Sequence, residues 1–191
     1  IMSTLEVNKI TPSTGTDITL GDSGDTFTIP SGVTITNNGT QTGFGGTNTP
    51  AFFAKLSGNQ TISTDTVTIV QFDTEVYDTD SAFDTSNYRF TVPSGKAGKY
   101  VFTAHQAYHN PNNSTATRHQ IMFYKNGSVV DFHGDVCQAQ SASADPSLNF
   151  TTQLDLAVGD YVDVRVNQNA QHNETLQSAW SRFFGYRLIG V

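Results

Sequence analysis

From residue 50 onward, apolar and polar residues alternate in short runs that are typical of β-strands. In the run 99–108, Tyr100 and Phe102 fall on one face of such a strand and Val101 on the other. Turn signals such as Asn126-Gly127 separate the runs. The predicted strands are 51–56, 66–72, 88–92, 99–108, 118–125, 129–132, 148–156, 161–166 and 183–189. This succession of short strands without a helical period predicts an all-β sandwich.

The first part of the chain carries a shorter pattern, in which an alternating segment and a glycine turn recur every eight residues. The units are 17–24, 25–32 and 33–40, with the inward pairs Ile18/Leu20, Phe27/Ile29 and Val33/Ile35. Units this thin cannot bury two apolar side chains each and need neighbours. The pattern therefore predicts a thin β-repeat or extended trimeric shaft. A flexible tail is the alternative, because Thr- and Gly-rich sequence also suits disorder.

A glycine-rich stretch at 43–50 separates these two patterns and is typical of a linker. We therefore predict two parts in the chain. Residues 1–48 form the N-terminal shaft or an extended attachment segment, and residues 49–191 form a globular head.

The amino-acid composition and the absence of certain motifs argue against several classes of fold and function. Only 14% of the 191 residues are charged, and Thr, Ser, Asn and Gly supply the polarity, which disfavours a helical bundle. The net charge of −7 has no clustered basic stripe, which argues against nucleic-acid binding. No apolar run approaches the roughly 18 residues of a membrane span. The sequence has no nucleophile elbow, zinc-protease motif or phosphate-binding loop, so we expect a protein that is not an enzyme.

The order of motifs in the second part is more specific than the fold class. The motifs are Ala-Phe-Phe-Ala-Lys-Leu at 51–56, Val-Gln-Phe-Asp at 70–73, Tyr-Arg-Phe-Thr-Val-Pro at 88–93, Gly-Lys-Tyr-Val-Phe-Thr at 98–103, Tyr-Lys-Asn-Gly at 124–127, Leu-Asp-Leu at 154–156, Gly-Asp-Tyr-Val at 159–162 and Phe-Phe-Gly-Tyr-Arg-Leu at 183–188. This succession resembles the globular head of complement subcomponent q, within the tumour-necrosis-factor-like superfamily, over residues 51–190. The resemblance implies a ten-stranded jelly roll that assembles as a homotrimer.

The last predicted strand can bury both of its faces, since each face carries apolar residues. A strand of this kind suits the inner sheet of a trimer, where one face packs on the core and the other on neighbouring subunits. The predicted interface residues are Phe183, Phe184, Tyr186 and Leu188.

The N-terminal part resembles segments of marine bacteriophage tail-fibre and virion proteins, which carry similar Thr- and Gly-rich repeats. A shaft with a trimeric knob predicts a virion protein that attaches to the host cell surface, with other virion proteins bound through the N-terminal segment. Two alternatives remain open. One is a virion decoration or scaffold trimer without a receptor, and the other is an extracellular, secreted ligand-like head.

The acidic segment 73–84 is the best candidate for a metal site. Asp78, Asp80 and Asp84 could offer hard oxygen ligands to Ca²⁺, although the segment lacks the glycine and terminal Glu of an EF-hand loop. A solvated acidic loop is the alternative. His105 and His109 share one strand face and could bind a transition metal around a three-fold axis, or be ordinary surface residues. No other cofactor is expected.

Long polar loops between the strands are candidates for receptor recognition. An aromatic residue beside amide side chains can bind a carbohydrate through stacking and hydrogen bonds, although ordinary solvent-exposed loops have the same composition. The predicted receptor-binding residues are Tyr108, His109, Asn112, Asn113, His133 and Trp180.

Overall fold

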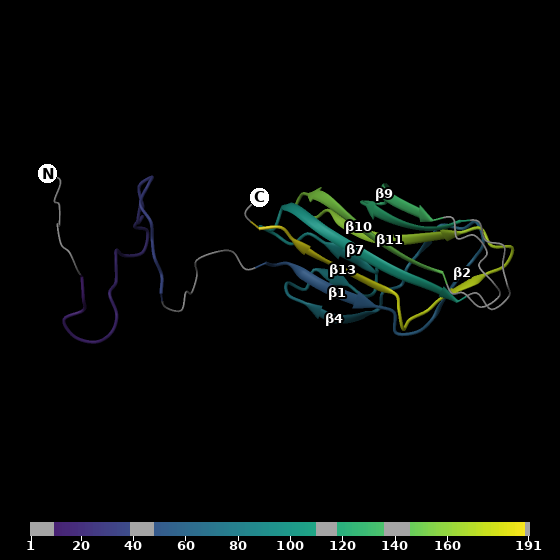
Figure 1. Ribbon diagram of the computed structural model, residues 1–191, viewed down its shortest axis with the longest axis horizontal. Helices are drawn as coiled ribbons and strands as arrows, with labels where there is room; N and C mark the ends of the chain where they lie inside the picture. Colours follow the sequence, from purple (N-terminus) through teal and green to yellow (C-terminus); the bar gives the residue numbers. More distant parts are fainter. Residues whose placement is uncertain (1–9, 39–47, 110–117, 136–145, 190–191) are drawn as a thin grey trace. The chain divides into compact units, whose positions relative to one another are not determined.

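The computed structural model describes residues 10–38, 48–109, 118–135 and 146–189, with the side chains of 132–135 left out (Figure 1). The chain divides into two compact units, Ile1–Phe44 and Gly45–Val191. Each unit is described separately below.

The described part of the first unit consists of extended segments and turns, and no strand is assigned within 10–38. Two turns recur at the predicted period of eight residues. The Asp25 amide donates to the Asp22 carbonyl at 3.0 Å, and the Val33 amide donates to the Pro30 carbonyl at 3.2 Å. Gly24 and Gly32 occupy equivalent places in these turns with φ values of +99° and +84°, which favour glycine. The turns of the repeat are thus present, and its extended segments are unpaired in a single chain.

The second unit is a two-sheet β-sandwich (Figure 1). Its strands in the described residues are β1 (Ala51–Lys55), β2 (Gln60–Ile62), β3 (Thr68–Ile69), β4 (Thr74–Asp78), β5 (Phe83–Asp84), β6 (Arg89–Thr91), β7 (Gly98–His109), β8 (His119–Lys125), β9 (Ser128–Asp135), β10 (Ser147–Leu156), β11 (Tyr161–Gln168), β12 (Glu174–Leu176) and β13 (Arg182–Arg187). The first sheet has the order β2-β12-β7-β13-β1-β4, with β10 also paired to β7. The second has the order β5-β6-β11-β8-β9, with β3 paired to β11. All pairings are antiparallel, and the predicted jelly roll is confirmed.

The strand count differs from the ten expected, because short segments pair at the ends and edges of the sheets. The strands β2, β5 and β12 have only two or three residues each and give little periodic signal. The predicted strand 66–72 contracts to β3. The segment 73–84, expected to be an acidic loop, begins with the strand β4 on the open edge of β1.

Aromatic rings fill the space between the sheets. Phe52 on β1 lies 4.9 Å from Phe83, 5.1 Å from Phe90 and 4.9 Å from Phe183, measured between ring centroids. Phe102 on β7 lies 6.0 Å from Phe183. These rings come from both sheets, so burial of their apolar surface holds the sheets together.

Close packing in this core requires a residue without a side chain on β13. A Cβ atom at Gly185 would lie 2.5 Å from Cδ1 of Phe102 and 2.9 Å from the Val101 carbonyl oxygen. Glycine therefore lets β13 lie against the ring of its neighbour on β7.

Two turns at one end of the second sheet are tied together by a carboxylate. Asp160 accepts hydrogen bonds from Lys125 Nζ at 2.8 Å, from Asn126 Nδ2 at 2.7 Å and from the Ala157 amide at 2.8 Å. Asn126 and Gly127 form the hairpin turn between β8 and β9 with φ values of +51° and +81°, as their sequence predicts. The bonds from Lys125, Asn126 and Ala157, in that order, lower the pKa of Asp160 from 3.8 to about 2.

We expect the Asp160→Asn variant to lose part of the acid dependence of folding stability. A lowered pKa means that ionised Asp160 stabilises the fold above its unfolded-state pKa of 3.8, and that this contribution is lost as the pH falls toward about 2. Urea titrations at several pH values should show a flatter decline for Asp160→Asn than for the native chain in this interval. The control is Asp155→Asn, since Asp155 is exposed and lies 3.8 Å from Lys99. Equal pH slopes for native chain and Asp160→Asn would contradict the assignment.

Candidate functional site

The exterior face of the first sheet carries a continuous row of apolar side chains. Strand register places Tyr77 on β4 beside Phe53 on β1, and Phe53 beside Phe184 on β13. The rings of Phe53 and Tyr77 are 6.2 Å apart at an interplanar angle of 70°, and those of Phe53 and Phe184 are 5.9 Å apart at 76°. Two residues further along β13, and so on the same face, Tyr186 pairs with Val101 on β7. We call Tyr77, Phe53, Phe184, Tyr186 and Val101 the apolar strip.

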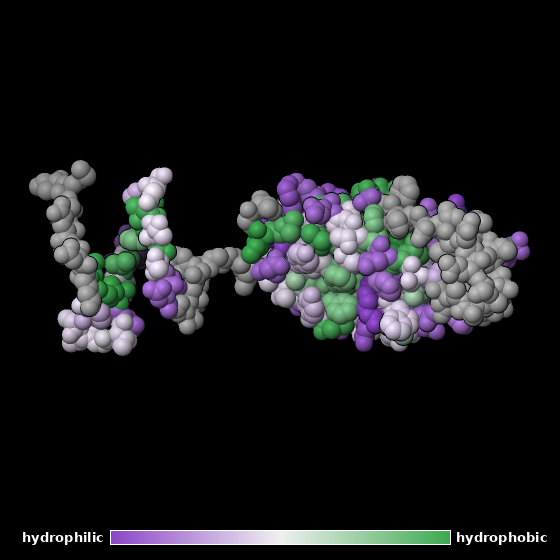
Figure 2. All heavy atoms as spheres, viewed as in Figure 1, coloured by the Kyte–Doolittle hydropathy of each residue, from purple (hydrophilic) through white to green (hydrophobic). Residues whose placement is uncertain are grey.

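The apolar strip is uncovered in the single chain. Tyr77 is 49% exposed and Tyr186 is 37% exposed, while the other three members are half-buried. Figure 2 shows apolar surface over β13, β1 and β4 on the face seen there. Aromatic rings in edge-on contact make a rigid surface that can pack against another protein at low entropic cost.

Polar residues border the strip on two sides. Toward the β10 edge, the Thr103 and Thr151 hydroxyls are 2.8 Å apart, and the exposed Gln153 pairs with Val101. Toward one end of the sheet, Arg182 pairs with His105. An apolar centre with a polar rim is the usual anatomy of a protein–protein interface.

Beyond this rim, Trp180 projects from a turn that several hydrogen bonds hold in place. The Arg182 guanidinium donates to the carbonyls of Ser178 at 3.0 Å and Ser181 at 2.9 Å, and to that of Ala179. His105 Nδ1 donates to the Trp180 carbonyl at 2.6 Å. The Trp180 side chain is 59% exposed. The turn is thus held in place by hydrogen bonds while its indole ring stays exposed.

The interior of the sandwich contains a buried hydrogen-bonded pair, His119 and Glu174, near the end of β7 that carries Tyr108. His119 Nε2 on β8 lies 2.5 Å from Glu174 Oε2 on β12, with side-chain exposures of 1% and 0%. The Tyr108 ring packs on the His119 ring with centroids 4.5 Å apart. Since β8 and β12 belong to different sheets, the pair ties the sheets together.

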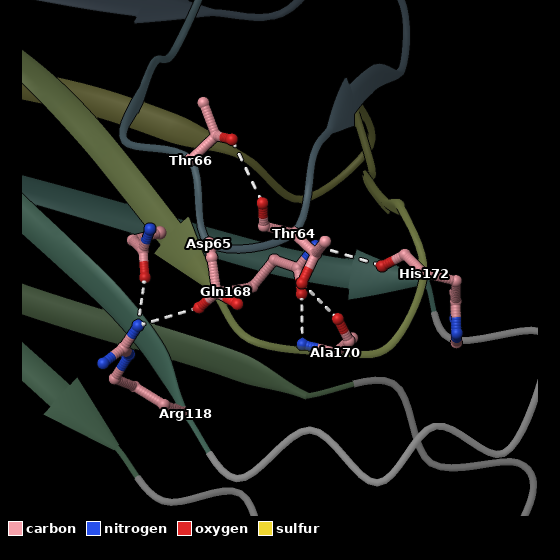
Figure 3. A network of polar contacts seen from close by, with 8 residues as sticks. Thr64, Asp65, Thr66, Arg118, Gln168, Ala170 and His172 are labelled. Atoms are coloured by element: carbon pink, nitrogen blue, oxygen red, sulfur yellow. Dashed lines mark hydrogen bonds and ion pairs between the residues drawn. The ribbon is translucent and has the colours of Figure 1, made fainter.

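A network of polar contacts links the loops that follow β2 and β11 to the start of β8 (Figure 3). Arg118 donates to Asn167 Oδ1 at 2.8 Å and to Asp65 Oδ1 at 3.3 Å (Figure 3). Gln168 donates to the carbonyls of Ile62 at 3.1 Å and His172 at 3.2 Å, and accepts from the Ala170 amide at 2.5 Å. The Gln168 bonds satisfy backbone groups of the loops and the Arg118 bonds join their side chains, so we assign the network a structural role.

The predicted interface residues divide between the two faces of β13. Phe184 and Tyr186 lie on the exterior face within the apolar strip, and Leu188 is half-buried just after the strand. Phe183 is fully buried between the sheets, so the prediction that it contacts a neighbouring subunit is wrong. Alternation along the strand is the reason, because adjacent residues point to opposite faces.

The predicted receptor-binding residues are likewise separated. Trp180 and His109 are exposed. Tyr108 is fully buried against His119, which corrects its assignment to a receptor-binding surface. Asn112 and Asn113 lie outside the described residues, and His133 lies in β9 with its side chain outside them.

The calcium site predicted from Asp78, Asp80 and Asp84 is not formed. Asp78 accepts hydrogen bonds from the amides of Asp80 at 3.2 Å and Phe83 at 2.7 Å, which shapes the turn after β4. Asp80 pairs with Lys96 at 3.4 Å, and Asp84 accepts from Asn87 Nδ2 at 2.5 Å. Within the residues of one chain that the structure describes, no three His, Cys, Asp or Glu side chains gather as metal ligands. A histidine site around a three-fold axis would draw its ligands from three copies, and it stays a prediction.

Three members of the apolar strip were missed in the sequence. Phe53 and Val101 were available from alternation, since each is the neighbour of an inward aromatic residue in a predicted strand. Tyr77 gave no such signal, because the carboxylates around it favour a loop.

Comparison with known proteins identifies the class of this head as a jelly roll of the tumour-necrosis-factor type. The globular domain of zebrafish complement 1qA superposes with a TM-score of 0.51 at 17% identity, covering 73% of this chain and 98% of that one. The Eiger TNF of S. frugiperda gives 0.53 at 13% identity, covering 74% and 93%. Murine APRIL at pH 5.0 gives 0.51 at 15% identity, covering 72% and 98%. At these identities the likeness shows the fold.

Comparison of the sequence with protein families gives a more specific classification than the fold. The C1q domain family matches residues 51–188, and the chain belongs to that family. Its members are non-enzymatic binding domains, which confirms the expectation of a protein without catalysis. No curated protein matches the sequence. The described residues include no helix that is long and apolar enough to cross a membrane.

Proposed function

We propose that this protein is a homotrimeric binding head whose subunits meet through the apolar strip. The observation that carries the proposal is the strip itself, a row of interlocked aromatic rings on the exterior of a sheet whose other face already packs on the core. An exposed apolar surface with a polar rim is costly in water unless a partner covers it. Membership of the C1q family supports another copy of the chain as that partner.

The proposed trimer binds its target through the end of the head that carries Trp180. The indole is exposed on a turn that Arg182 and His105 hold in place, so little flexibility is lost when a ligand stacks on it. Three copies carry a net charge of −21, three times the −7 of one chain. This charge repels anionic surfaces at long range, so a neutral glycan is the favoured ligand class.

We further propose that the trimer is a bacteriophage fibre or knob that attaches to the host cell surface, anchored to other virion proteins by residues 1–48. The repeat of the N-terminal segment supports this placement. Three weak sites that engage together would supply avidity without a deep pocket. A secreted ligand-like head is the second candidate, and the C1q family match favours it.

Binding of the purified chain to intact bacterial cells and to arrayed neutral glycans tests the proposal. We expect a species of three times 20.7 kDa that binds cells, blocks infection, and loses at least about tenfold in affinity in Trp180→Ala. The matched control is Val158→Ala, an exposed apolar residue in the turn between β10 and β11. A monomer at micromolar concentration would refute the trimer. A trimer that binds no cells and leaves infection unchanged would favour a decoration role, and binding to animal cells alone would favour the ligand-like head.

A further inference from the structure

The described part of the N-terminal unit is a regular repeat whose apolar side chains are mostly exposed, with Ile29 half-buried. Ile18, Leu20, Phe27, Val33 and Ile35 are between 45% and 67% exposed. They alternate with Thr along extended segments, so the apolar residues of each unit lie on one face of their segment. A row of this kind is a half-formed β-structure that lacks neighbouring strands.

The distribution of charge along the repeat indicates which kind of strand could pair with it. Residues 10–38 contain no Lys, Arg or His. The extended segments 18–20, 26–29 and 33–36 contain no charge; Asp17 precedes the first of them, and Asp22 and Asp25 lie in a turn. The Asp25 carboxylate also accepts the Asp22 amide at 2.8 Å, which fixes its place in that turn. Identical copies of the extended segments can therefore lie side by side without like charges facing one another.

The connection to the head supplies the reason for pairing with copies of the same chain. The chain passes from Pro50 directly into β1, and β1 contributes Phe53 to the apolar strip. The trimer proposed above would therefore start three identical N-terminal segments beside one interface. Tethering at one end raises their effective concentration to the millimolar range, roughly, so weak pairing between them becomes favourable.

We propose that the extended segments 18–20, 26–29 and 33–36 pair with the same segments of two further copies, through backbone hydrogen bonds, with the apolar side chains facing the shared axis. The eight-residue units stack along that axis, and Gly24 and Gly32 turn each chain at the same level. This inference rests on the proposed trimer, since it needs the head to gather three segments.

Amide hydrogen exchange of the full-length purified protein tests the pairing. In the proposed shaft, the amides of 18–20, 26–29 and 33–36 exchange at least about 100-fold more slowly than in an unstructured peptide. Phe27→Asp should abolish this protection, because it puts a charge on the shared axis. The matched control is Thr28→Asp, whose side chain lies on the opposite face of the same segment and which should keep the protection.

The mass of each variant separates failure of this inference from failure of the proposed function. Native exchange at the unstructured rate in a protein of three times 20.7 kDa would overturn the shaft and leave the trimeric head standing. Equal protection in Phe27→Asp and the native chain would also overturn it. A monomeric native chain would overturn the trimer and the shaft together.

Discussion

Replacing Phe184 by Asp is expected to convert the trimer into monomers and to leave the head folded. Phe184 lies at the centre of the apolar strip, between Phe53 on the adjacent strand and Thr103 on the other side. Three symmetry-related carboxylates would be moved out of water in one interface, and each costs several kcal/mol to desolvate without a partner. Sedimentation at micromolar concentration should give 20.7 kDa for this variant and three times that mass for the native chain.

A second exposed apolar residue provides the control. Val129 on β9 is 50% exposed in the other sheet, so Val129→Asp makes the same kind of change outside the strip and should remain trimeric. Circular dichroism checks that Phe184→Asp keeps its β-structure. A folded Phe184→Asp trimer would refute the proposed interface, and dissociation of both variants would show that the strip is not the specific contact.

The second large effect is expected at the buried pair between His119 and Glu174. Glu174→Leu leaves His119 Nε2 without the oxygen that lies 2.5 Å away, in a site with 1% exposure. A buried polar group that loses its hydrogen-bond partner typically costs about 1–3 kcal/mol of folding stability. Urea unfolding at neutral pH and one fixed protein concentration measures this loss, because the stability of an oligomer depends on concentration.

A double variant shows whether the cost arises from the unpaired histidine. His119→Leu combined with Glu174→Leu removes both polar groups and should recover most of the stability lost in Glu174→Leu, because apolar replacement of a whole buried pair is often neutral. A loss below about 1 kcal/mol in Glu174→Leu would contradict the role of the pair. A double variant no more stable than Glu174→Leu would assign the loss to packing instead.

The main strands could be predicted from the sequence because their faces differ in chemistry. In the run 99–108, the aromatic residues Tyr100 and Phe102 stand two positions apart on one face, and the structure has β7 there, with both of them buried. The same alternation, extended to its end, places Tyr108 on the inward face, so its burial could have been predicted as well. The polar residues that follow Tyr108 favour a loop and so compete with this signal.

The pairing of β4 could not be predicted, because its evidence lies on another strand. Glu75 and Asp78 favour a loop when only neighbouring residues are considered. The open edge of β1 supplies backbone partners that outweigh this local preference. The pairing of β4 also explains why the aspartates do not form one site. The carboxylate of Asp78 accepts hydrogen bonds from the amides of the turn after β4, and that of Asp84 accepts from the Asn87 amide.

The candidate site was predicted in part. Phe184, Tyr186 and Trp180 are exposed or half-exposed where the sequence placed surface contacts. The clamp of Arg182 on the turn before β13 was not foreseen, because it depends on three carbonyl groups that converge only when the chain folds.

Gly185 has a consequence for how the inner sheet finds its alignment. Both β1 and β13 carry consecutive phenylalanines, so a slip of one residue would still deliver an aromatic ring to the core from each strand. Hydrophobicity alone therefore does not distinguish the native strand register from one that is shifted by one residue. A slipped β13 would set Phe184 or Tyr186 against the Phe102 ring, where even a Cβ atom comes within 2.5 Å. Gly185 thus excludes the shifted register by a steric clash. It thereby determines which aromatic rings of β13 are buried in the core and which lie on the exterior face.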